Sequence, residues 1–436
     1  MGNKTVLESG TWQHKQVNIF PELQARRLVH DSTPAAALEE RLANHSVGVY
    51  VGFDPTANSL HVGHLLGQIS LRRLQLAGHR PFPLAGGATG MVGDPSGRSE
   101  ERNLLDAETL SYNVACISGQ LSRLLDFSPG KYSATLVNNA DWTAQVTALD
   151  FLRDVGKHIT INQMLAKDSV KSRLTSENGL SFTEFSYMLL QANDFRHLSA
   201  THDVELQMGG SDQWGNITAG IDLIRKTQSR QAHGITWPLV TRSDGSKFGK
   251  TADGAVWLDA ERTSPYQFRQ FWMQLSDAEI ARYLPQFSLS TLDECAALLA
   301  EHAAAPEKRV AQKHLAHELT AMVHGDPGAQ AAAQVSDILF GADPTSASVE
   351  AFLAVAREVP CSTIQDMPID VVTLLSDIKL CSSKSEARRT IEQGGVRING
   401  QVVTLETSVG DITELHGKYL LVRRGKTAYH LVEKKR

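Results

Sequence analysis

Short apolar stretches alternate with longer helical patterns through the first 260 residues of the chain. The short stretches cover residues 47–53, 80–87, 134–139, 204–210 and 235–241. Strands that alternate with helices are joined by crossover connections, and these connections build a parallel sheet covered by helices. Ligands of such sheets bind at the carboxyl ends of the strands. The sequence therefore predicts an α/β, doubly wound parallel-sheet domain whose functional residues directly follow its strands.

The remaining sequence changes character twice. Residues 264–340 are rich in Ala, Leu and Glu with helical spacing, which predicts a small helical domain. A linker is expected to start at 341–348, and beyond residue 370 two short helices precede Asn399-Gly400, a strong hairpin signal between apolar runs. We expect an N-terminal extension (1–20), an α/β domain (21–263), a helical domain (264–340), a linker (341–369) and a C-terminal α+β domain (370–436).

Charge is distributed unevenly along the chain. The net charge is −5, but residues 371–436 contain twelve Lys and Arg against seven Asp and Glu, which leaves −10 for the first 370 residues. A basic C-terminal domain indicates contact with nucleic acid or another anionic surface. A merely solvated basic surface remains the alternative.

Composition argues against several other classes of protein. No apolar run reaches membrane-spanning length, and the first twenty residues lack the apolar core of a secretion signal, so we expect a cytoplasmic location. The four cysteines stand far apart without paired spacing. This pattern argues against a zinc knuckle and a disulfide framework, and we predict no protein-held metal.

The stretch YVGFDPTANSLHVGHLLGQISL, residues 50–71, combines a strand, a turn and the start of a helix. His61 and His64 fall in the first helical turn, where free backbone N–H groups and the helix dipole favour an anion. Gly63 leaves room for a flat ring or sugar to approach the backbone. The placement favours nucleotide binding over a zinc site, which would need a third ligand nearby.

A second motif, residues 181–195, predicts a polar pocket. Ser181 and Glu184 form a capping-box pattern at the start of a helix. Tyr187, Gln191 and Asp194 then follow at i, i+4 and i+7 among large apolar residues. Buried Asp and Gln side chains require partners, which a ligand with several polar groups would supply. A solvated helix face is the alternative.

Three further loops carry polar residues after predicted strands. Residues 206–220 place Gln207, Asp212 and Gln213 around Gly209 and Gly210, where a doubly wound sheet holds a nucleotide sugar. The glycine-rich stretch 86–102 contains Asp94, Arg98 and Arg102, although plain turn chemistry could explain it. The lysine loop, residues 245–251, carries Lys247 and Lys250, which could neutralise charge on a polyphosphate in the transition state.

These motifs together resemble bacterial-type tyrosyl-tRNA synthetase, a class I aminoacyl-tRNA synthetase. HVGH at 61–64 resembles the HIGH signature, and KFGKT at 247–251 resembles the KMSKS loop. GFDPT, GDPSG, FTEFSY and GGSDQWGN follow in family order, and the similarity runs from about residue 20 to the C-terminus. Residues from about 370 resemble the alpha-L RNA-binding motif shared with a small-subunit ribosomal protein. The resemblance implies a Rossmann-like catalytic domain.

The resemblance also implies a role for each matching residue. Tyr50 and Asp194 would contact the phenol hydroxyl of tyrosine. The ammonium group would be held by Asp94, Tyr187 and Gln191, and Gln213 would lie near the carboxylate and α-phosphate. The ATP site would comprise Gly52, Asp54, Thr56, His61, Gly63, His64, Gly210, Asp212 and Lys250. The leaving pyrophosphate would be clamped by Arg98, Arg102, Lys247 and Lys250, and catalysis would rest on these four with Thr56, His61 and His64.

Further implications concern partners and departures from the family pattern. ATP would be a substrate accompanied by Mg²⁺, tRNA(Tyr) would bind through Lys384, Arg388, Arg389 and Arg397, and a homodimer would form around residues 151–158. Val51 stands where some relatives carry a cysteine that touches the ribose, which implies a weaker ATP contact. Val62 replaces isoleucine, a neutral change.

The implied reaction is attack of the tyrosine carboxylate on ATP, followed by acyl transfer to tRNA. A carboxylate is already a nucleophile, so positioning and charge stabilisation should dominate. Three alternatives remain open: a tryptophanyl-tRNA synthetase, a small-metabolite nucleotidyltransferase with a His-x-Gly-His loop, and a non-catalytic RNA-binding relative.

Overall fold

The computed structural model describes residues 17–96, 105–174, 179–242, 248–251, 254–364 and 370–435, without the side chains of residues 168, 169, 172, 250 and 251. The chain divides into two compact units. Unit 1 contains the chain up to Asp259 together with Leu275–Ala311, and unit 2 contains Ala260–Gln274 and Gln312–Arg436. No helix in the described part of the chain is long and apolar enough to cross a membrane.

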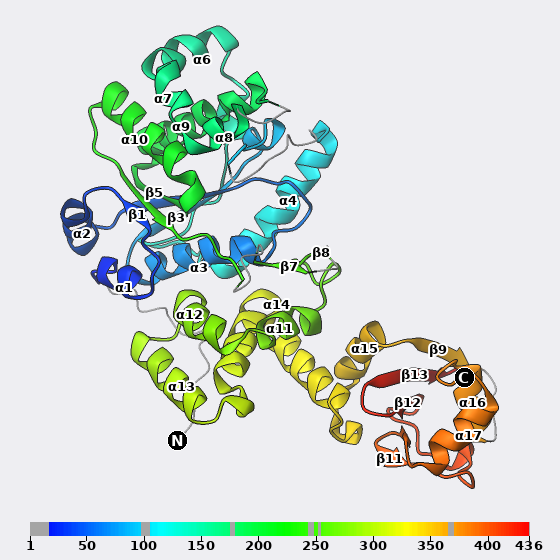
Figure 1. Ribbon diagram of the computed structural model, residues 1–436. Coiled ribbons are helices and arrows are strands. Elements are labelled where there is room, and N and C mark those ends of the chain that lie inside the picture. The colour runs from blue at the N-terminus through cyan, green and yellow to red at the C-terminus, as the bar shows by residue number, and fades with distance from the viewer. Residues whose placement is uncertain are drawn as a thin grey trace. The chain divides into compact units, whose positions relative to one another are not determined.

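Unit 1 is built around a six-stranded sheet (Figure 1). Its order is β1 (Asp31–Ser32), β6 (His233–Trp237), β5 (Val204–Gly210), β2 (Gly48–Phe53), β3 (Arg80–Ala85) and β4 (Val137–Asn138). Strands β2 to β6 pair in parallel, which confirms the predicted parallel sheet. The short β1, which the sequence pattern did not predict, is antiparallel to β6.

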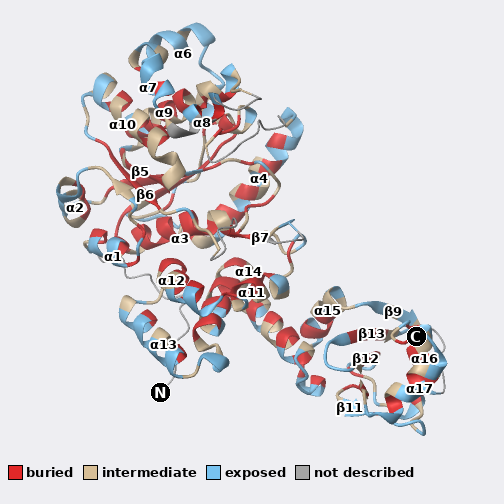
Figure 2. Cartoon of the chain, viewed as in Figure 1, coloured by how far each residue is buried: buried red, intermediate tan, exposed pale blue. Residues whose placement is uncertain are grey.

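Helices cover both faces of this sheet (Figure 1). Helices α3 (Val62–Leu76) and α4 (Ala107–Leu124) contact β3 on one side, and α9 (Phe182–His202) and α10 (Trp214–Gln228) contact β5 on the other. The strands and the inner faces of these helices are buried (Figure 2). Tyr50, Phe82 and Phe195 pack in one cluster between β2, β3 and α9. The carboxyl end of β2 therefore lies on a rigid core.

The smaller elements of unit 1 surround this core. The helices are α1 (Phe20–Ala25), α2 (Ala35–Asn44), α5 (Ala140–Thr143), α6 (Ala148–Asp154), α7 (Ile161–Leu165), α8 (Asp168–Leu174), α12 (Asp277–Phe287) and α13 (Leu292–Ala304), and β7 (Lys250–Thr251) pairs with β8 (Gly254–Ala255). The buried Arg26 donates to carbonyl oxygens at the end of α12 and just beyond it, and the buried Arg73 donates to the carbonyl oxygen of Gln286 at 2.7 Å. Since Arg73 lies on α3, α12 is held against the helix that begins with the two histidines.

Unit 2 combines helices with a second sheet. Its helices are α11 (Pro265–Met273), α14 (Val310–Leu339, interrupted at Gly325), α15 (Val349–Glu358), α16 (Val371–Asp377) and α17 (Lys384–Glu392). The sheet order is β11 (Gln401–Val402), β10 (Val396–Ile398), β12 (Tyr419–Arg424), β13 (Ala428–Lys434) and β9 (Cys361–Ile364). β9 is parallel to β13, and the other neighbours are antiparallel.

Alternating side chains of β12 face two different cores. Leu420 and Val422 pack with residues of α16 and α17, whereas Tyr419 and Leu421 pack with residues of α14 and α15. Successive side chains of a strand point to opposite faces, so both faces of this sheet are covered. The C-terminal sheet thus shares a hydrophobic core with α14 and α15, the helices that precede it in sequence.

Two sequence predictions can be compared with unit 2. The hairpin is confirmed, because Asn399 and Gly400, both with positive φ, connect β10 to β11. Within the predicted linker 341–369, however, the structure contains α15 and β9. Ser348 caps α15, and the buried Phe352 and Val355 attach it to the core. The domain bounds drawn from the sequence otherwise stay a prediction, and residues 1–16 of the N-terminal extension lie outside the described part.

Candidate active site

The two histidines of the HVGH motif lie at the start of α3, directly after β2 and its turn. His61 is the N-cap residue, and its Nδ1 atom accepts the N–H of Gly63 at 3.0 Å. The Nδ1 atom of His64 accepts the N–H of His61 at 3.2 Å, and the two rings stack with centroids 3.9 Å apart. A ring nitrogen that accepts a hydrogen bond carries no proton, so each neutral ring carries its proton on Nε2. An Nε2–H group is a donor suited to phosphate oxygens.

Gly63 is required by the position of the His61 ring. A Cβ atom at Gly63 would lie 2.7 Å from Cε1 of His61, closer than carbon atoms can approach. From the sequence alone, the only reason for a glycine at position 63 is room for a ligand to approach the backbone. The structure adds an internal reason, which is that the capping ring occupies the space a side chain would need.

The described part of the lysine loop rests against the same helix. Phe248 is buried, with its ring 4.8 Å from that of Tyr283 on α12. Gly249 has φ 81°, and a Cβ atom there would overlap Cγ2 of Val62. The first turn of α3 and the loop therefore fit together only with glycine at 249. Lys247, Arg98, Arg102 and the side chain of Lys250 lie outside the described residues.

Asp194 is held by two donors that the sequence motifs did not include. Asn139 donates to Oδ2 at 2.9 Å, and the indole of Trp142 donates to Oδ1 at 2.9 Å. Only 2% of Asp194 is exposed. Burial raises the pKa of this carboxyl to about 7, and the two hydrogen bonds oppose the rise only in part. The carboxyl group is oriented by its surroundings and lies close to its titration point at neutral pH.

Tyr50, on β2, faces the same region. Its hydroxyl is buried and finds no hydrogen-bond partner among the described residues, and the same holds for Oε1 of Gln207 on the neighbouring strand. Burial, followed by the charge of Asp194, raises the pKa of Tyr50 well above its usual value, so the phenol stays protonated. An unpaired buried polar group costs about 1–3 kcal/mol. A ligand with a polar group at this point would remove that cost.

Asp54 connects the residues assigned to ATP with those assigned to the amino acid. Its Oδ2 atom accepts the hydroxyl of Tyr187 at 2.9 Å, and its Oδ1 atom accepts that of Thr89 at 2.8 Å. Asn139 donates to Thr89 as well as to Asp194. Asp54, Tyr187 and Asp194 consequently belong to one hydrogen-bonded network.

Asp94 anchors a second network. Its Oδ2 atom accepts the amide of Gln213 at 2.7 Å, and Gln191 donates to Gln213 at 3.3 Å. Asn216 donates to both glutamines, and the ammonium of Lys167 donates to Asn216. The structure therefore brings together Asp94, Gln191 and Gln213, whereas Tyr187, which the sequence groups with Asp94 and Gln191, is bonded to Asp54.

The remaining predicted residues surround these networks or lie in the other unit. Gly52 and Thr56 are exposed at the end of β2 and in its turn. Gly210, the last residue of β5, and Asp212, directly after it, are partly buried. Lys384, Arg388 and Arg389 are exposed on α17, and Arg397 is partly buried on β10. These four belong to unit 2.

Sequence reasoning missed Thr89, Asn139, Trp142, Lys167 and Asn216. Asn139 ends the predicted strand 134–139 and Trp142 follows it, so the rule that places ligands after parallel strands could have found them. Asn216 lies within a motif already singled out. Lys167 follows no strand, and only its contacts in three dimensions reveal it.

Comparisons with known proteins decide the family. Residues 42–341 match the family described as tRNA synthetases class I (W and Y), and residues 352–432 match the tyrosine--tRNA ligase SYY-like C-terminal domain. The chain is 48% identical over 426 residues to the tyrosine--tRNA ligase of Roseiflexus castenholzii, covering 95% of this chain and 99% of that protein. The chain belongs to the tyrosine--tRNA ligase family. The enzyme of Bacteroides fragilis (strain YCH46) is 49% identical over 429 residues, with the same coverage.

A solved structure agrees with this family assignment. The C-terminally truncated mitochondrial tyrosyl-tRNA synthetase of Aspergillus nidulans is 32% identical, with a TM-score of 0.68 over 74% of this chain and 94% of that one. Members of the tyrosine--tRNA ligase family are aminoacyl-tRNA synthetases. The parallel sheet of unit 1 is therefore the Rossmann-like sheet of a class I synthetase.

Proposed function

We propose that this chain activates L-tyrosine with ATP and then transfers the tyrosyl group to the 3′-terminal ribose of tRNA(Tyr). The observation that carries the proposal is the Tyr50 hydroxyl, which has no partner among the described residues, together with the oriented carboxyl group of Asp194, whose charge acts on it. A phenol hydroxyl can donate to a carboxylate and accept from a second phenol. Phenylalanine can do neither, and an indole N–H can only donate, so this pair of groups favours tyrosine over both.

The first step is attack of the tyrosine carboxylate on the α-phosphorus of ATP. A carboxylate oxygen–phosphorus bond forms, the bond between the α-phosphorus and its bridging oxygen breaks, and pyrophosphate leaves with that electron pair. The nucleophile is already anionic, so no base is needed and orientation dominates. Asp94, Tyr187 and Gln191 would hold the ammonium group, and Gln213 would lie near the carboxylate and α-phosphate.

The phosphates would meet the first turn of α3. The Nε2–H groups of His61 and His64 would donate to phosphate oxygens, and Gly52, Thr56, Gly63, Gly210 and Asp212 would line the rest of the nucleotide site. Asp54 would act through Tyr187, to which it is hydrogen-bonded. Arg98, Arg102, Lys247 and Lys250 would neutralise the leaving pyrophosphate. In the second step a ribose hydroxyl of tRNA attacks the tyrosyl carbonyl, and AMP leaves.

ATP is the expected substrate of this family, and Mg²⁺ would arrive with it. Among the described residues, no group of three or more His, Cys, Asp or Glu side chains is placed to hold a metal ion. We therefore assign the described residues no step that depends on a metal ion.

A homodimer would cover an apolar surface on unit 1. Helices α6 to α9 carry the exposed apolar side chains that would contribute to it, namely Leu149, Leu152, Ile161, Leu174 and Phe182, and Figure 2 shows α6 as largely exposed. Exposed apolar side chains that gather on one face are typical of association sites. Sedimentation of the wild type as a dimer and of Phe182→Asp as a monomer would support this role, whereas a monomeric wild type would contradict it.

The decisive experiment is pyrophosphate exchange into ATP, with tyrosine, phenylalanine or tryptophan supplied alone and without tRNA. Exchange with tyrosine only is expected. Exchange with tryptophan would overturn the substrate assignment, and exchange with none of the three would favour a non-catalytic RNA-binding role. The cytoplasmic location stays a prediction.

A further inference from the structure

Lys167 reaches into the amino-acid network from a separate segment of the chain. Its carbonyl oxygen accepts the N–H of Lys171 in α8, while its ammonium group donates to Oδ1 of Asn216 on α10 at 2.7 Å. Helix α8, which follows Lys167, is attached to α9 by an ion pair between Arg173 and Glu184. The two side chains are 2.8 Å apart and almost fully buried. Lys167 is therefore held by rigid structure and is not a solvated surface lysine.

The hydrogen-bond chemistry of these groups determines how three amides are oriented. A lysine ammonium can only donate, so it selects the oxygen of Asn216 as its partner. The amide nitrogen of Asn216, which is 5% exposed, then donates to Oε1 of Gln191 at 2.9 Å and Oε1 of Gln213 at 3.1 Å. Both glutamine oxygens are thus turned toward Asn216, and the Gln213 nitrogen is directed to Asp94 at 2.7 Å.

We propose that Lys167 is a positioning residue for the amino-acid site, because its ammonium group and Asp94, at the two ends of this network, together fix the amide orientation of Asn216, Gln191 and Gln213. The inference rests on the proposed function of that site. If the cation is removed, Asp94 still orients Gln213, but the buried Oδ1 atom of Asn216 loses its charged donor. Asn216 can then turn away from the glutamines, and Gln191 loses the N–H group that fixes its oxygen, which weakens tyrosine binding.

The charged surroundings of Lys167 make its proton sensitive to pH. It lines a cavity of about 870 Å³ that is also lined by His30, Asp31, Asp212 and Asp222. His30 pairs with Asp31, and Asp222 pairs with Arg225 and Lys226. Burial lowers the pKa of Lys167 to about 7, and Asp94 opposes this shift. A neutral amine can also accept a hydrogen bond, so loss of this proton removes the orienting effect.

The test compares Lys167→Met and Lys167→Arg with Lys171→Met, an exposed control on α8. Tyrosine binding is measured by calorimetry without ATP, and the kinetics of pyrophosphate exchange are measured on the same variants. In Lys167→Met the tyrosine Kd should rise about tenfold, as expected for one lost charged hydrogen bond, with the KM for ATP unchanged. Lys171→Met should match the wild type.

Lys167→Arg supplies a readout that a purely structural role would not change. Arginine stays protonated at neutral pH, so the variant should bind tyrosine like the wild type at pH 6 and about fivefold or more tighter at pH 8. A constant affinity ratio between the two proteins from pH 6 to 8, or an unchanged Kd in Lys167→Met, would overturn the inference. Failure of wild-type exchange with tyrosine would instead overturn the proposed function, so the two failures are distinguishable.

Discussion

Trp142 donates its indole N–H to Oδ1 of Asp194 at 2.9 Å, and its ring stacks on His197 with centroids 4.4 Å apart. Asn139 donates to the second oxygen of the same carboxyl group. Both oxygens of Asp194 are therefore oriented before a substrate binds. Discrimination against phenylalanine, for which this enzyme class is the standard case, requires that orientation, because a rotated carboxyl group could not meet the phenol.

Removal of the indole donor should weaken tyrosine binding. In Trp142→Phe the aromatic ring can still stack on His197, but the hydrogen bond to Asp194 is lost. Hydrogen bonds to charged groups contribute about 1.5–3 kcal/mol, so the KM for tyrosine in the exchange reaction should rise roughly tenfold or more. The KM for ATP serves as the internal control, and equal rises in both would contradict a specific effect on the amino-acid pocket.

The raised pKa of Asp194 should appear in the pH dependence of stability. The folded protein holds this proton up to about pH 7, whereas the unfolded chain releases it near the ordinary value of 3.8. The folded state thus binds more protons between these values, and the stabilisation is lost as the pH rises toward 7. Relative to Asp194→Asn, the free energy of unfolding should fall by about 1.4 kcal/mol per pH unit between pH 5 and 7. Urea unfolding at each pH measures the difference, and a constant difference would rule out the raised pKa.

The contact of Gly249 with Val62 predicts a catalytic effect of a single methyl group. Gly249→Ala adds a Cβ atom that overlaps Val62 and requires φ 81° of a non-glycine residue, a backbone cost of about 1–3 kcal/mol. The lysine loop must move, so kcat for exchange should fall about tenfold or more with little change in the KM for tyrosine. Gly254→Ala is the matched control, since Gly254 also has positive φ but has no atom near the added Cβ among the described residues. Equal losses in both variants would attribute the effect to backbone strain alone.

The ion pair between Arg173 and Glu184 should be costly to break from one side. Both side chains are almost fully buried, at 2% and 1% exposure. Arg173→Met leaves the Glu184 carboxylate buried without this partner, and such changes destabilise proteins by about 3–5 kcal/mol. The double variant Arg173→Met/Glu184→Met should recover much of this loss, as measured by the urea midpoint of unfolding. Additive losses would show that the pair does not act as a unit.

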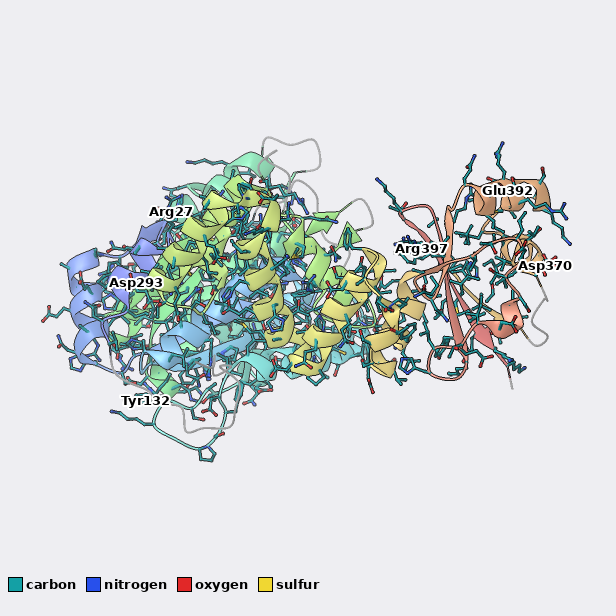
Figure 3. All side chains as sticks on the ribbon, turned by 90° about the horizontal axis from the view of Figure 1, so that it is seen from below. Arg27, Tyr132, Asp293, Asp370, Glu392 and Arg397 are labelled. Atoms are coloured by element: carbon teal, nitrogen blue, oxygen red, sulfur yellow. The ribbon has the colours of Figure 1, made fainter. Side chains whose placement is uncertain are left out.

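The exposed cations of α17 should affect tRNA and leave adenylate formation unchanged. Figure 3 shows Glu392 on α17 and Arg397 in the same C-terminal part of unit 2. Arg388→Gln/Arg389→Gln removes two exposed charges, so tRNA binding should weaken. The slope of the logarithm of the binding constant against the logarithm of the salt concentration should become shallower by about 2. Pyrophosphate exchange without tRNA should stay at the wild-type rate. An unchanged salt dependence of tRNA binding would exclude these residues from the RNA contact.

Local features of the sequence predicted much of this fold. The alternation of apolar strands with helical patterns identified the parallel sheet, and Asn399-Gly400 identified the hairpin, because backbone preference and side-chain period are properties of neighbouring residues. The same reasoning located Tyr187, Gln191 and Asp194, which share one helix face. It also placed the two histidines at a helix start, where the free backbone N–H groups are a local property.

Only the tertiary structure decided which side chains meet. Tyr187 bonds Asp54 across 133 residues of sequence, Asn139 bonds Asp194 across 55, and Lys167 bonds Asn216 across 49. The linker region likewise became α15 and β9 because apolar faces of unit 2 could be buried there. Hydrogen-bond partners and buried contacts depend on how separate elements pack, and that arrangement has no counterpart in the spacing of neighbouring residues.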